Sequence, residues 1–447
     1  MKTVFIAVFQ GTEFRNIIRT DIYKELINQP NVRLVLFTDN EVKRDYFQSQ
    51  FNAPNVIYEI ANDYRPHWSA PIFGFLKYNL IKTGTLDMKR RRKLEQNGNY
   101  FNYYFRWLTN RLLANRLSRI ITRWAAFHLV RDDFFASYYD KYQPQMVLLA
   151  HLFSDIETSM LREAKRRKII SVGLINSWDK LTSRNMLLLL PDKMLVHNRI
   201  VKNEAIRLAD MSKKDITIVG IPHFDHHFKT PRSSKKEFAK RFGLDPNKRY
   251  VVFCPEGKTY IDSDGQMASL IDEMIASGEL PNDLQLIIRL PPNDIIDIYP
   301  YKTKVVIQQA GKRFSKKRGV DWDMDEEDFR LLADTMRHAS VIILYASTVA
   351  MDAAVFNKPL ISVNIKFPNY PSTDWVYEYE HCGTLLRTGG LDYVRTRADL
   401  ANSIKRYLEN PQFNDDGRSR IREEQCHYLD GRSGKRVAEY ILDLLNV

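Results

Sequence analysis

The residues best suited to bind a phosphate lie in the segment from Val341 to Val363. An apolar strand there runs into a turn containing Ser347 and Thr348, followed by an alanine-rich helix that carries Asp352. Ligands of open α/β sheets bind outside the carboxyl ends of the strands, and free N–H groups at a helix start suit an anion. We interpret Ser347 and Thr348 as phosphate-binding residues and Asp352 as an acceptor for a ribose or sugar hydroxyl. The alternative is structural, with Ser347 as a helix cap and Asp352 as a first-turn acid.

Three further residues of this half are candidate phosphate contacts. Lys258 follows the apolar run that ends at Cys254, and Arg289 closes another apolar run directly before two prolines. A forked guanidinium is well suited to a diphosphate. Ser433 precedes the last helix and offers another helix start to an anion. Each could instead belong to an ordinary turn, but several such loops at one sheet edge favour a common site.

Candidate catalytic residues follow the strands expected in the first half of the chain. Glu13 lies in the loop after the first strand, His151 follows another, and Asp179 lies next to Trp178. An aromatic ring beside a carboxylate is suited to a sugar, and transfer to a hydroxyl with inversion needs one base near that oxygen. Transfer with retention needs no obvious base, so Glu13, His151 and Asp179 remain alternatives, and Glu13 could also be a cap.

Two clusters could suggest a metal ion. His223, His226 and His227 form an HxxHH pattern, but no fourth ligand with convincing spacing is near. The acidic run 321–328 resembles a DxD motif, yet it also suits the N-terminus of the helix that follows. We therefore expect no metal and no resident cofactor.

Alternation of strands and helices predicts a parallel sheet covered on both faces in each half of the chain. In the first half we expect a helix over Asn16–Asn28 and these strands: Thr3–Phe9, Val32–Phe37, Asn55–Ile60, Gln145–Ala150, Ile169–Ile175, Lys193–Val196 and Ile216–Val219. In the second half we expect these: Tyr250–Cys254, Leu284–Arg289, Lys304–Gln308, Val341–Tyr345 and Pro359–Val363. A polar stretch near 220–234 suggests domains of residues 1–225 and 226–447.

A helical insertion of about residues 64–141 interrupts the first series. Between Lys82 and Arg131 it carries twelve Lys or Arg against two acids, a net charge of +10 in a chain of net +13. Aromatic residues are frequent in the same segment. This combination suits a membrane surface with anionic lipid, while the chain has no signature of a nucleic-acid-binding protein. The alternative is a solvated helix face.

Composition is that of a globular protein of a reducing compartment. Three well-separated cysteines make neither a disulfide framework nor a thiolate metal site, and no window of eighteen apolar residues predicts a membrane span. The apolar start is too short for a signal peptide and is expected to be a buried strand. We expect a cytosolic protein that associates peripherally with the inner face of the membrane.

Several motifs resemble those of one enzyme group. Ser177-Trp178-Asp179-Lys180-Leu181-Thr182-Ser183 is similar to the "SWDNLTS" segment of bacterial surface-polysaccharide glycosyltransferases with the GT-B fold. The loop and helix from Gly11 to Leu26 resemble the start of that group. Residues 347–361 are similar to the "SST…EAA…GKP.I" donor segment, which CDP-glycerol glycerophosphotransferases, Kdo transferases and UDP-N-acetylglucosamine 2-epimerases share. Ala346 and Asp352 depart from this pattern, so the donor cannot be copied from one relative.

The resemblance implies a GT-B fold, with two Rossmann-like domains that face each other across a cleft. It implies a glycosyltransferase that moves a sugar from an activated donor to a cell-surface glycan. A lipid-linked acceptor would explain the basic, aromatic insertion, because it would hold the enzyme at the inner membrane surface. The donor would bind the second domain, and Arg15, Asn16 and Trp178 of the first would contact the acceptor. Two alternatives remain open: a CDP-alditol phosphotransferase or nucleotide-sugar epimerase on the same fold, and a non-catalytic nucleotide- or glycan-binding protein.

Overall fold

The computed structural model describes residues 1–292, 294–315 and 321–447, and they form two compact units. The first unit contains Met1–His223, Tyr379–His381 and Arg432–Val447. The second contains Phe224–Glu378 and Cys382–Gly431. The chain therefore passes from the second unit back to the first twice.

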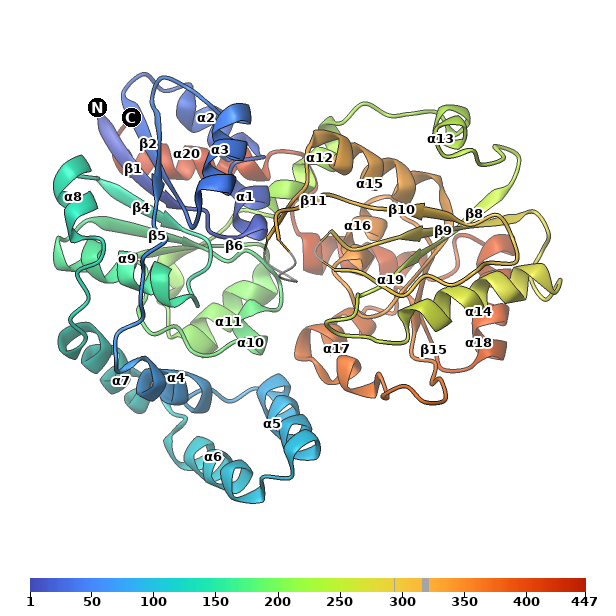
Figure 1. The fold of residues 1–447 in the computed structure, drawn as a ribbon, viewed down its shortest axis with the longest axis horizontal. Coiled ribbons are helices and arrows are strands. Elements are labelled where there is room, and N and C mark those ends of the chain that lie inside the picture. Colours follow the sequence, from blue (N-terminus) through green and yellow to red (C-terminus); the bar gives the residue numbers. More distant parts are fainter. Residues whose placement is uncertain (293, 316–320) are drawn as a thin grey trace. The chain divides into compact units, whose positions relative to one another are not determined.

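The first unit is built on a seven-stranded parallel sheet in the order β3-β2-β1-β4-β5-β6-β7 (Figure 1). The order reverses between β1 and β4, as in Rossmann-like folds. Its strands are β1 (Lys2–Ala7), β2 (Val32–Thr38), β3 (Val56–Ile60), β4 (Met146–Leu149), β5 (Ile170–Leu174), β6 (Lys193–Val196) and β7 (Ile216–Ile218). Five of the six residues of β1 are buried, because helices cover both faces. The expected strands are all present, and each end lies within two residues of the expected position.

The helix expected over Asn16–Asn28 is wrong as a single element. The chain forms α1 (Gly11–Ile17) and α2 (Asp21–Ile27) instead. Thr20 separates them, because its backbone is extended and its side chain accepts a hydrogen bond from the Ile22 N–H as the cap of α2. A hydroxyl that caps a helix competes with the preceding helix for local backbone groups.

The remaining helices of this sheet are α3 (Glu41–Gln50), α9 (Asp155–Arg166), α10 (Lys180–Ser183), α11 (Arg199–Ala209) and α20 (Ser433–Leu445). The last helix, α20, packs on α2 and places Val437, Ile441 and Leu445 in the core of the first unit. The expected assignment of all residues after 225 to a second domain differs from this arrangement. The C-terminal residues belong to the first unit because the hydrophobic face of α20 is buried there.

The insertion is helical and forms an arm beside the first sheet (Figure 1). It contains α4 (Ala70–Asn79), α5 (Gly84–Asn97), α6 (Tyr100–Leu113), α7 (Arg116–Leu129) and α8 (Ala136–Tyr142). Arg119 and Arg123 of α7 bind Asp210, which anchors the arm. Much of α6 and α7 stays exposed, although their spacing of apolar residues is that of an amphipathic helix.

The second unit holds a six-stranded parallel sheet in the order β10-β9-β8-β13-β14-β15. Its strands are β8 (Arg249–Cys254), β9 (Leu284–Arg289), β10 (Val306–Gln308), β13 (Ala339–Leu344), β14 (Leu360–Val363) and β15 (Asp392–Val394). A small antiparallel pair, β11 (Lys312–Arg313) and β12 (Trp322–Asp323), lies outside it. The strand β15 was not expected from the sequence, because three residues carry too little periodicity.

The helices of the second unit are α12 (His226–Lys229), α13 (Lys235–Phe242), α14 (Asp264–Ala276), α15 (Glu326–His338), α16 (Val349–Val355), α17 (Glu380–Leu386), α18 (Arg397–Glu409) and α19 (Asp415–Arg420). The first residues of α17 belong to the first unit. Both sheets have the Rossmann-like order, so the expected α/β fold with two Rossmann-like domains is confirmed. No helix among the described residues is long and apolar enough to cross a membrane.

Candidate functional site

Polar side chains lie at the carboxyl edge of the first sheet, in the loops that follow four neighbouring strands. Glu13 follows β1, His151 follows β4, Asn176 follows β5 and His197 follows β6. Their strands are parallel neighbours, which brings these loops to one edge. Six buried side-chain atoms here have no hydrogen-bond partner: Glu13 Oε1, Asn16 Oδ1, His151 Nδ1, Glu157 Oε1, Asn176 Nδ2 and His197 Nε2. Buried polar groups are normally paired, so this cluster is the arrangement expected of a ligand site.

Glu13 and Glu157 form a buried pair of interacting carboxyl groups. Burial raises the pKa of Glu13 to about 7, against backbone hydrogen bonds from Gln10 and Phe9 and the charges of Lys180 and Lys43. Burial and the neighbouring Glu13 raise the pKa of Glu157 well above its ordinary value. Two buried carboxylates that repel each other cannot both ionise easily, so near neutral pH the pair can accept a proton.

Local structure fixes the position of each carboxyl group. Glu13 Oε2 accepts hydrogen bonds from the N–H groups of Phe9 at 2.6 Å and Gln10 at 2.9 Å. The bond from the Gln10 N–H belongs to a capping box at the start of α1. Glu157 Oε2 accepts one from the His151 N–H at 2.8 Å. The structural role that the sequence left open for Glu13 is therefore present, and its Oε1 remains available for another contact.

Asp179 is a different kind of carboxylate. Burial acts to raise its pKa, but the charges of Lys180 and His381 and the hydroxyls of Ser177 and Ser183 outweigh it and lower the pKa. Ser177 Oγ lies 2.5 Å from Oδ1 and Ser183 Oγ lies 2.9 Å from Oδ2. An ionised carboxylate whose two oxygens are both engaged is a weak candidate for the base and a good anchor for the loop.

Lys180 acts electrostatically on all three predicted catalytic residues. Its charge acts on the pKa of Glu13, His151 and Asp179, and its own pKa is lowered by burial. Burial and the charges of Lys180 and Arg184 lower the pKa of His151 to about 3, so its imidazole is neutral. Sequence reasoning missed Lys180. The signal was its place in the "SWDNLTS"-like segment, where a lysine replaces the asparagine.

Trp178, predicted to contact the acceptor, is only 5% exposed. Its ring meets that of His381 edge-to-face at 4.8 Å between centroids. His381 comes from the short segment 379–381, which belongs to the first unit. Asn16 Nδ2 donates to the Asn176 carbonyl at 3.1 Å, which holds α1 against the loop after β5. The structure thus brings Asn16 and the catalytic candidates to the same edge.

A second cluster lies at the carboxyl edge of the second sheet. Arg289 ends β9 and is 5% exposed, and its Nη1 has no hydrogen-bond partner. Burial lowers its pKa, whereas Cys254, Asp328 and Asp352 act in the opposite direction. A guanidinium stays charged even so. A buried charge with an open donor is well placed to meet an anionic ligand.

Glu256 and Asp264 complete this cluster, and sequence reasoning assigned neither. Ser347 hydrogen bonds to Glu256, whose pKa burial raises to about 7. Asp264 Oδ2 accepts from the Gly257 N–H at 2.7 Å, and burial raises its pKa well above the ordinary value. Gly257 has a φ of 93°, and a Cβ there would lie 2.5 Å from Asp294 Cβ, so only glycine fits. For Glu256, the available signal was an acid in the loop that follows a buried strand.

Asp352 and three other predicted donor residues have surroundings that the sequence did not indicate. Asp352 Oδ1 lies 2.7 Å from His227 Nε2, which gives one histidine of the HxxHH pattern a carboxylate partner. Lys258 forms an ion pair with Asp297. Thr348 is exposed and makes no side-chain cap bond, and Ser433 belongs to the first unit. Among residues 1–292, 294–315 and 321–447, no group of three or more metal-ligating side chains could hold a metal ion.

Comparison with protein families decides the relationship of the chain. The family CDP-Glycerol:Poly(glycerophosphate) glycerophosphotransferase matches residues 115–443, well over half of the sequence. The protein belongs to this family. It is therefore a transferase of the sugar- and phosphate-transferring type that builds cell-surface polymers. Glu13, Arg15, Asn16 and most of the insertion precede the matched region. No curated protein matches the chain.

Solved structures share the fold of this family member at low sequence identity. UDP-GlcNAc 2-epimerase from Neisseria meningitidis, bound to UDP-GlcNAc, has a TM-score of 0.57 and 11% identity, with 99% of this chain and 100% of that chain covered. The wall teichoic acid polymerase TagF has a TM-score of 0.51 and 11% identity, with 100% and 89% covered. A glycosyltransferase from Rickettsia africae has 0.52 and 10%, with 99% and 98% covered. These likenesses confirm a GT-B-like fold.

Proposed function

We propose that the protein transfers a sugar from a nucleotide-activated donor to a hydroxyl of a cell-surface glycan. The observation that carries this proposal is the buried Glu13–Glu157 pair at the carboxyl edge of the first sheet. A carboxyl group with a pKa of about 7 suits a general base that works near neutral pH. Its open Oε1 is the atom that would accept the proton of the acceptor hydroxyl.

In the proposed reaction, the first cluster supplies the base and the second cluster binds the donor. Glu13 takes the proton as the acceptor oxygen attacks the anomeric carbon, and the bond from that carbon to the donor phosphate breaks. The nucleoside diphosphate leaves with the electron pair of that bond. Arg289 would stabilise its charge, with Ser347 and Asp352 as further donor contacts, because a fixed guanidinium acts strongly in a site shielded from water.

A second candidate function is transfer of an alditol phosphate from a CDP-activated donor, and the family match favours it. The same base would then activate a hydroxyl that attacks phosphorus rather than carbon. The bond that breaks is the one between the two phosphates, so cytidine monophosphate leaves. The nucleotide released therefore separates the two functions without any knowledge of the acceptor.

The proposed acceptor is attached to a lipid, so that the enzyme works at the cytoplasmic face of the membrane. Exposed apolar residues of the arm support this. On α6 they include Phe101, 83% exposed, and on α7 they include Leu117, 67% exposed. Soluble proteins rarely leave such faces open. The net charge of +10 between Lys82 and Arg131 would attract anionic lipid, at roughly 1 kcal/mol per basic residue near the surface.

A donor screen tests the proposed function. Purified protein is given UDP-, GDP- and TDP-sugars and CDP-glycerol with membrane extract as acceptor, and the released nucleotides are separated by chromatography. Release of a nucleoside diphosphate from one sugar donor is the expected result. Release of cytidine monophosphate would instead establish the second function, and no release from any donor would contradict both.

A matched pair of variants links this turnover to the second cluster. Arg289→Gln should lower kcat/KM by about 100-fold or more, since a lost charge contact to a phosphate costs several kcal/mol in the transition state. Arg249→Gln is the control, because Arg249 lies at the start of β8 and pairs with Asp283 at the surface. Equal turnover by both variants would refute the assignment of the donor site.

A further inference from the structure

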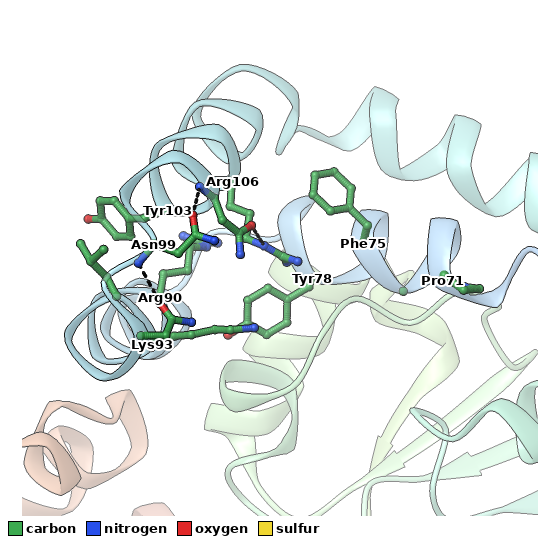
Figure 2. Close-up of a pocket in the computed structure, with 12 residues that line it drawn as sticks. Pro71, Phe75, Tyr78, Arg90, Lys93, Asn99, Tyr103 and Arg106 are labelled. Atoms are coloured by element: carbon green, nitrogen blue, oxygen red, sulfur yellow. Dashed lines mark hydrogen bonds between the residues drawn. The ribbon is translucent and has the colours of Figure 1, made fainter.

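The helical arm contains a cavity of about 360 Å³ that the transferase site does not use. It lies between α4, α5 and α6, and Figure 2 shows side chains from these helices around it. All of its lining residues fall between Pro71 and Arg106. They precede the family match, which begins at residue 115, so nothing in the family relationship assigns this cavity a role.

The lining contains a buried cation with unused donors. Arg90 is 4% exposed, and its Nε and Nη2 have no hydrogen-bond partner. Its remaining Nη1 contacts Asp87 of the same helix. A buried guanidinium with two open N–H groups loses hydration without full compensation, unless a ligand supplies acceptors. A planar fork of donors matches the oxygens of a phosphate.

Other lining residues give the cavity the character of an anion site. Lys93 and Arg106 add two cations, and none of the described residues that line it carries a carboxylate. Arg106 is held in place, because its Nε donates to Asn102 Oδ1 at 2.7 Å and its guanidinium lies 5.2 Å from the centre of the Phe75 ring. Amide and hydroxyl groups come from Asn97, Asn99, Asn102, Tyr78 and Tyr103, and the rest of the lining is Pro71, Gly74, Phe75 and Leu94.

The same helix connects the cavity with an apolar surface. Asn102, Tyr103 and Arg106 of α6 line the cavity, while Phe101 and Phe105 of α6 are 83% and 52% exposed. A charged group bound in the cavity would therefore have apolar side chains within one helical turn. A free inorganic anion would gain nothing from that surface. A lipid would, since its chains need a place outside water.

We propose that this cavity binds the phosphate-bearing headgroup of a membrane lipid, with Arg90, Lys93 and Arg106 as the phosphate ligands. The proposal rests on the membrane contact proposed above and is independent of the donor chemistry. The arm would then bind a lipid at one defined site, in addition to the general attraction of its apolar and basic surface to a membrane.

Titration of the full chain with monomeric short-chain lipids tests the cavity without a membrane. Dihexanoylphosphatidylglycerol below its micelle concentration is the probe, and calorimetry measures its affinity. Dihexanoylglycerol carries the same chains without phosphate, and inorganic phosphate carries no chains. We expect the phospholipid to bind at least tenfold more tightly than either of these.

Two variants and two matched controls locate the binding. Arg90→Gln removes the buried charge, whereas Arg91→Gln removes the same charge from a residue of α5 outside the lining. Gly74 lines the cavity, and a Cβ there meets open space, so Gly74→Phe fills the cavity while Gly74→Ala does not. Arg90→Gln and Gly74→Phe should each weaken binding at least tenfold, and the controls should stay within twofold of wild type.

Each contrary result overturns the proposal. Wild-type affinity in Gly74→Phe would place the lipid elsewhere, even if Arg90→Gln failed to fold. Equal affinity for inorganic phosphate would mean a phosphate site that does not recognise lipid, and no measurable binding of any probe would mean no site. Vesicle binding without short-chain lipid binding would uphold membrane attachment while refuting the cavity, so the two failures are distinguishable.

Discussion

At the scale of single residues, burial and neighbouring charge separate three candidates that the sequence could not rank. Glu13, His151 and Asp179 all follow strands and could all take a proton. In the structure Asp179 stays ionised between two hydroxyls, and His151 stays neutral among cations. Glu13, with a pKa of about 7, is the group whose protonation changes near physiological pH.

This assignment predicts the pH dependence of catalysis. Because Glu13 must be deprotonated to act as base, kcat/KM should rise with pH and level off above about pH 7. Glu13→Gln should abolish the rising limb and lower kcat by at least 100-fold, measured as nucleotide release. A variant with an unchanged pH profile would assign the base elsewhere.

The raised pKa of Glu13 also means that this residue lowers the stability of the folded protein at neutral and higher pH. The folded protein keeps a proton between pH 4.5 and 7 that the unfolded chain has already released. Stability from this group is therefore full below pH 4.5 and falls as the pH rises to about 7. Glu13→Gln, which resembles the protonated form, should raise the free energy of unfolding at pH 8 by about 1–3 kcal/mol. Urea unfolding at pH 8 checks this, and a loss of stability would contradict it.

At the scale of elements, α6 and α7 carry an apolar face that the described residues do not cover. Phe101 of α6 and Trp124 of α7 are 83% and 59% exposed, so a charge at either position should leave the fold intact. The double variant Phe101→Asp/Trp124→Asp should lose at least tenfold in affinity for vesicles with anionic lipid. Co-sedimentation measures this, and raised salt should weaken wild-type binding as well.

Val42→Asp is the control for this prediction, with one added negative charge against two in the arm variant. Val42 is 64% exposed on α3, so a charge there should not change vesicle affinity beyond its small effect on net charge. Equal loss in Val42→Asp and the arm variant would mean that net charge drives the binding. Equal binding by wild-type protein to neutral and anionic vesicles would refute the electrostatic part of the proposal.

At the scale of the whole molecule, α20 ties the end of the chain to the first unit. Ile441 is fully buried on the face that packs in that unit. Ile441→Ala should cost about 2–5 kcal/mol and speed hydrogen exchange in β1 and β2, with β8 and β13 unchanged. Asp443→Ala, at an exposed position of the same helix, should stay within about 0.5 kcal/mol of wild type. Faster exchange in the second sheet instead would contradict this assignment.

Much of the architecture could be predicted because parallel sheets leave a strong local signal. Each strand that is covered on both faces is a short apolar run, and each helix between strands shows apolar residues at helical spacing. The strands of the first sheet and the two-domain fold followed from these patterns. The missed break at Thr20 and the missed strand β15 involve too few residues to change a periodic pattern.

The candidate sites were partly predictable for the same reason. Ligands gather at the carboxyl ends of parallel strands, so polar residues that follow an apolar run identify the loops, as for Glu13, His151 and Arg289. The hydrogen-bond partners of these side chains could not be predicted from the sequence. His227 meets Asp352 over 125 positions, and Glu157 reaches the backbone of His151 only because α9 starts there.

The sequence by itself determined the fold, the sheet edges that carry polar loops and the basic character of the insertion, since composition and period are local properties. Only the tertiary structure decided which carboxyl groups hold a pKa near 7, that α20 belongs to the first unit, and that Arg90 lines a cavity. Burial and charge proximity arise from packing between distant segments. Those quantities set the chemistry of a side chain, so its role becomes defined only when the chain has folded.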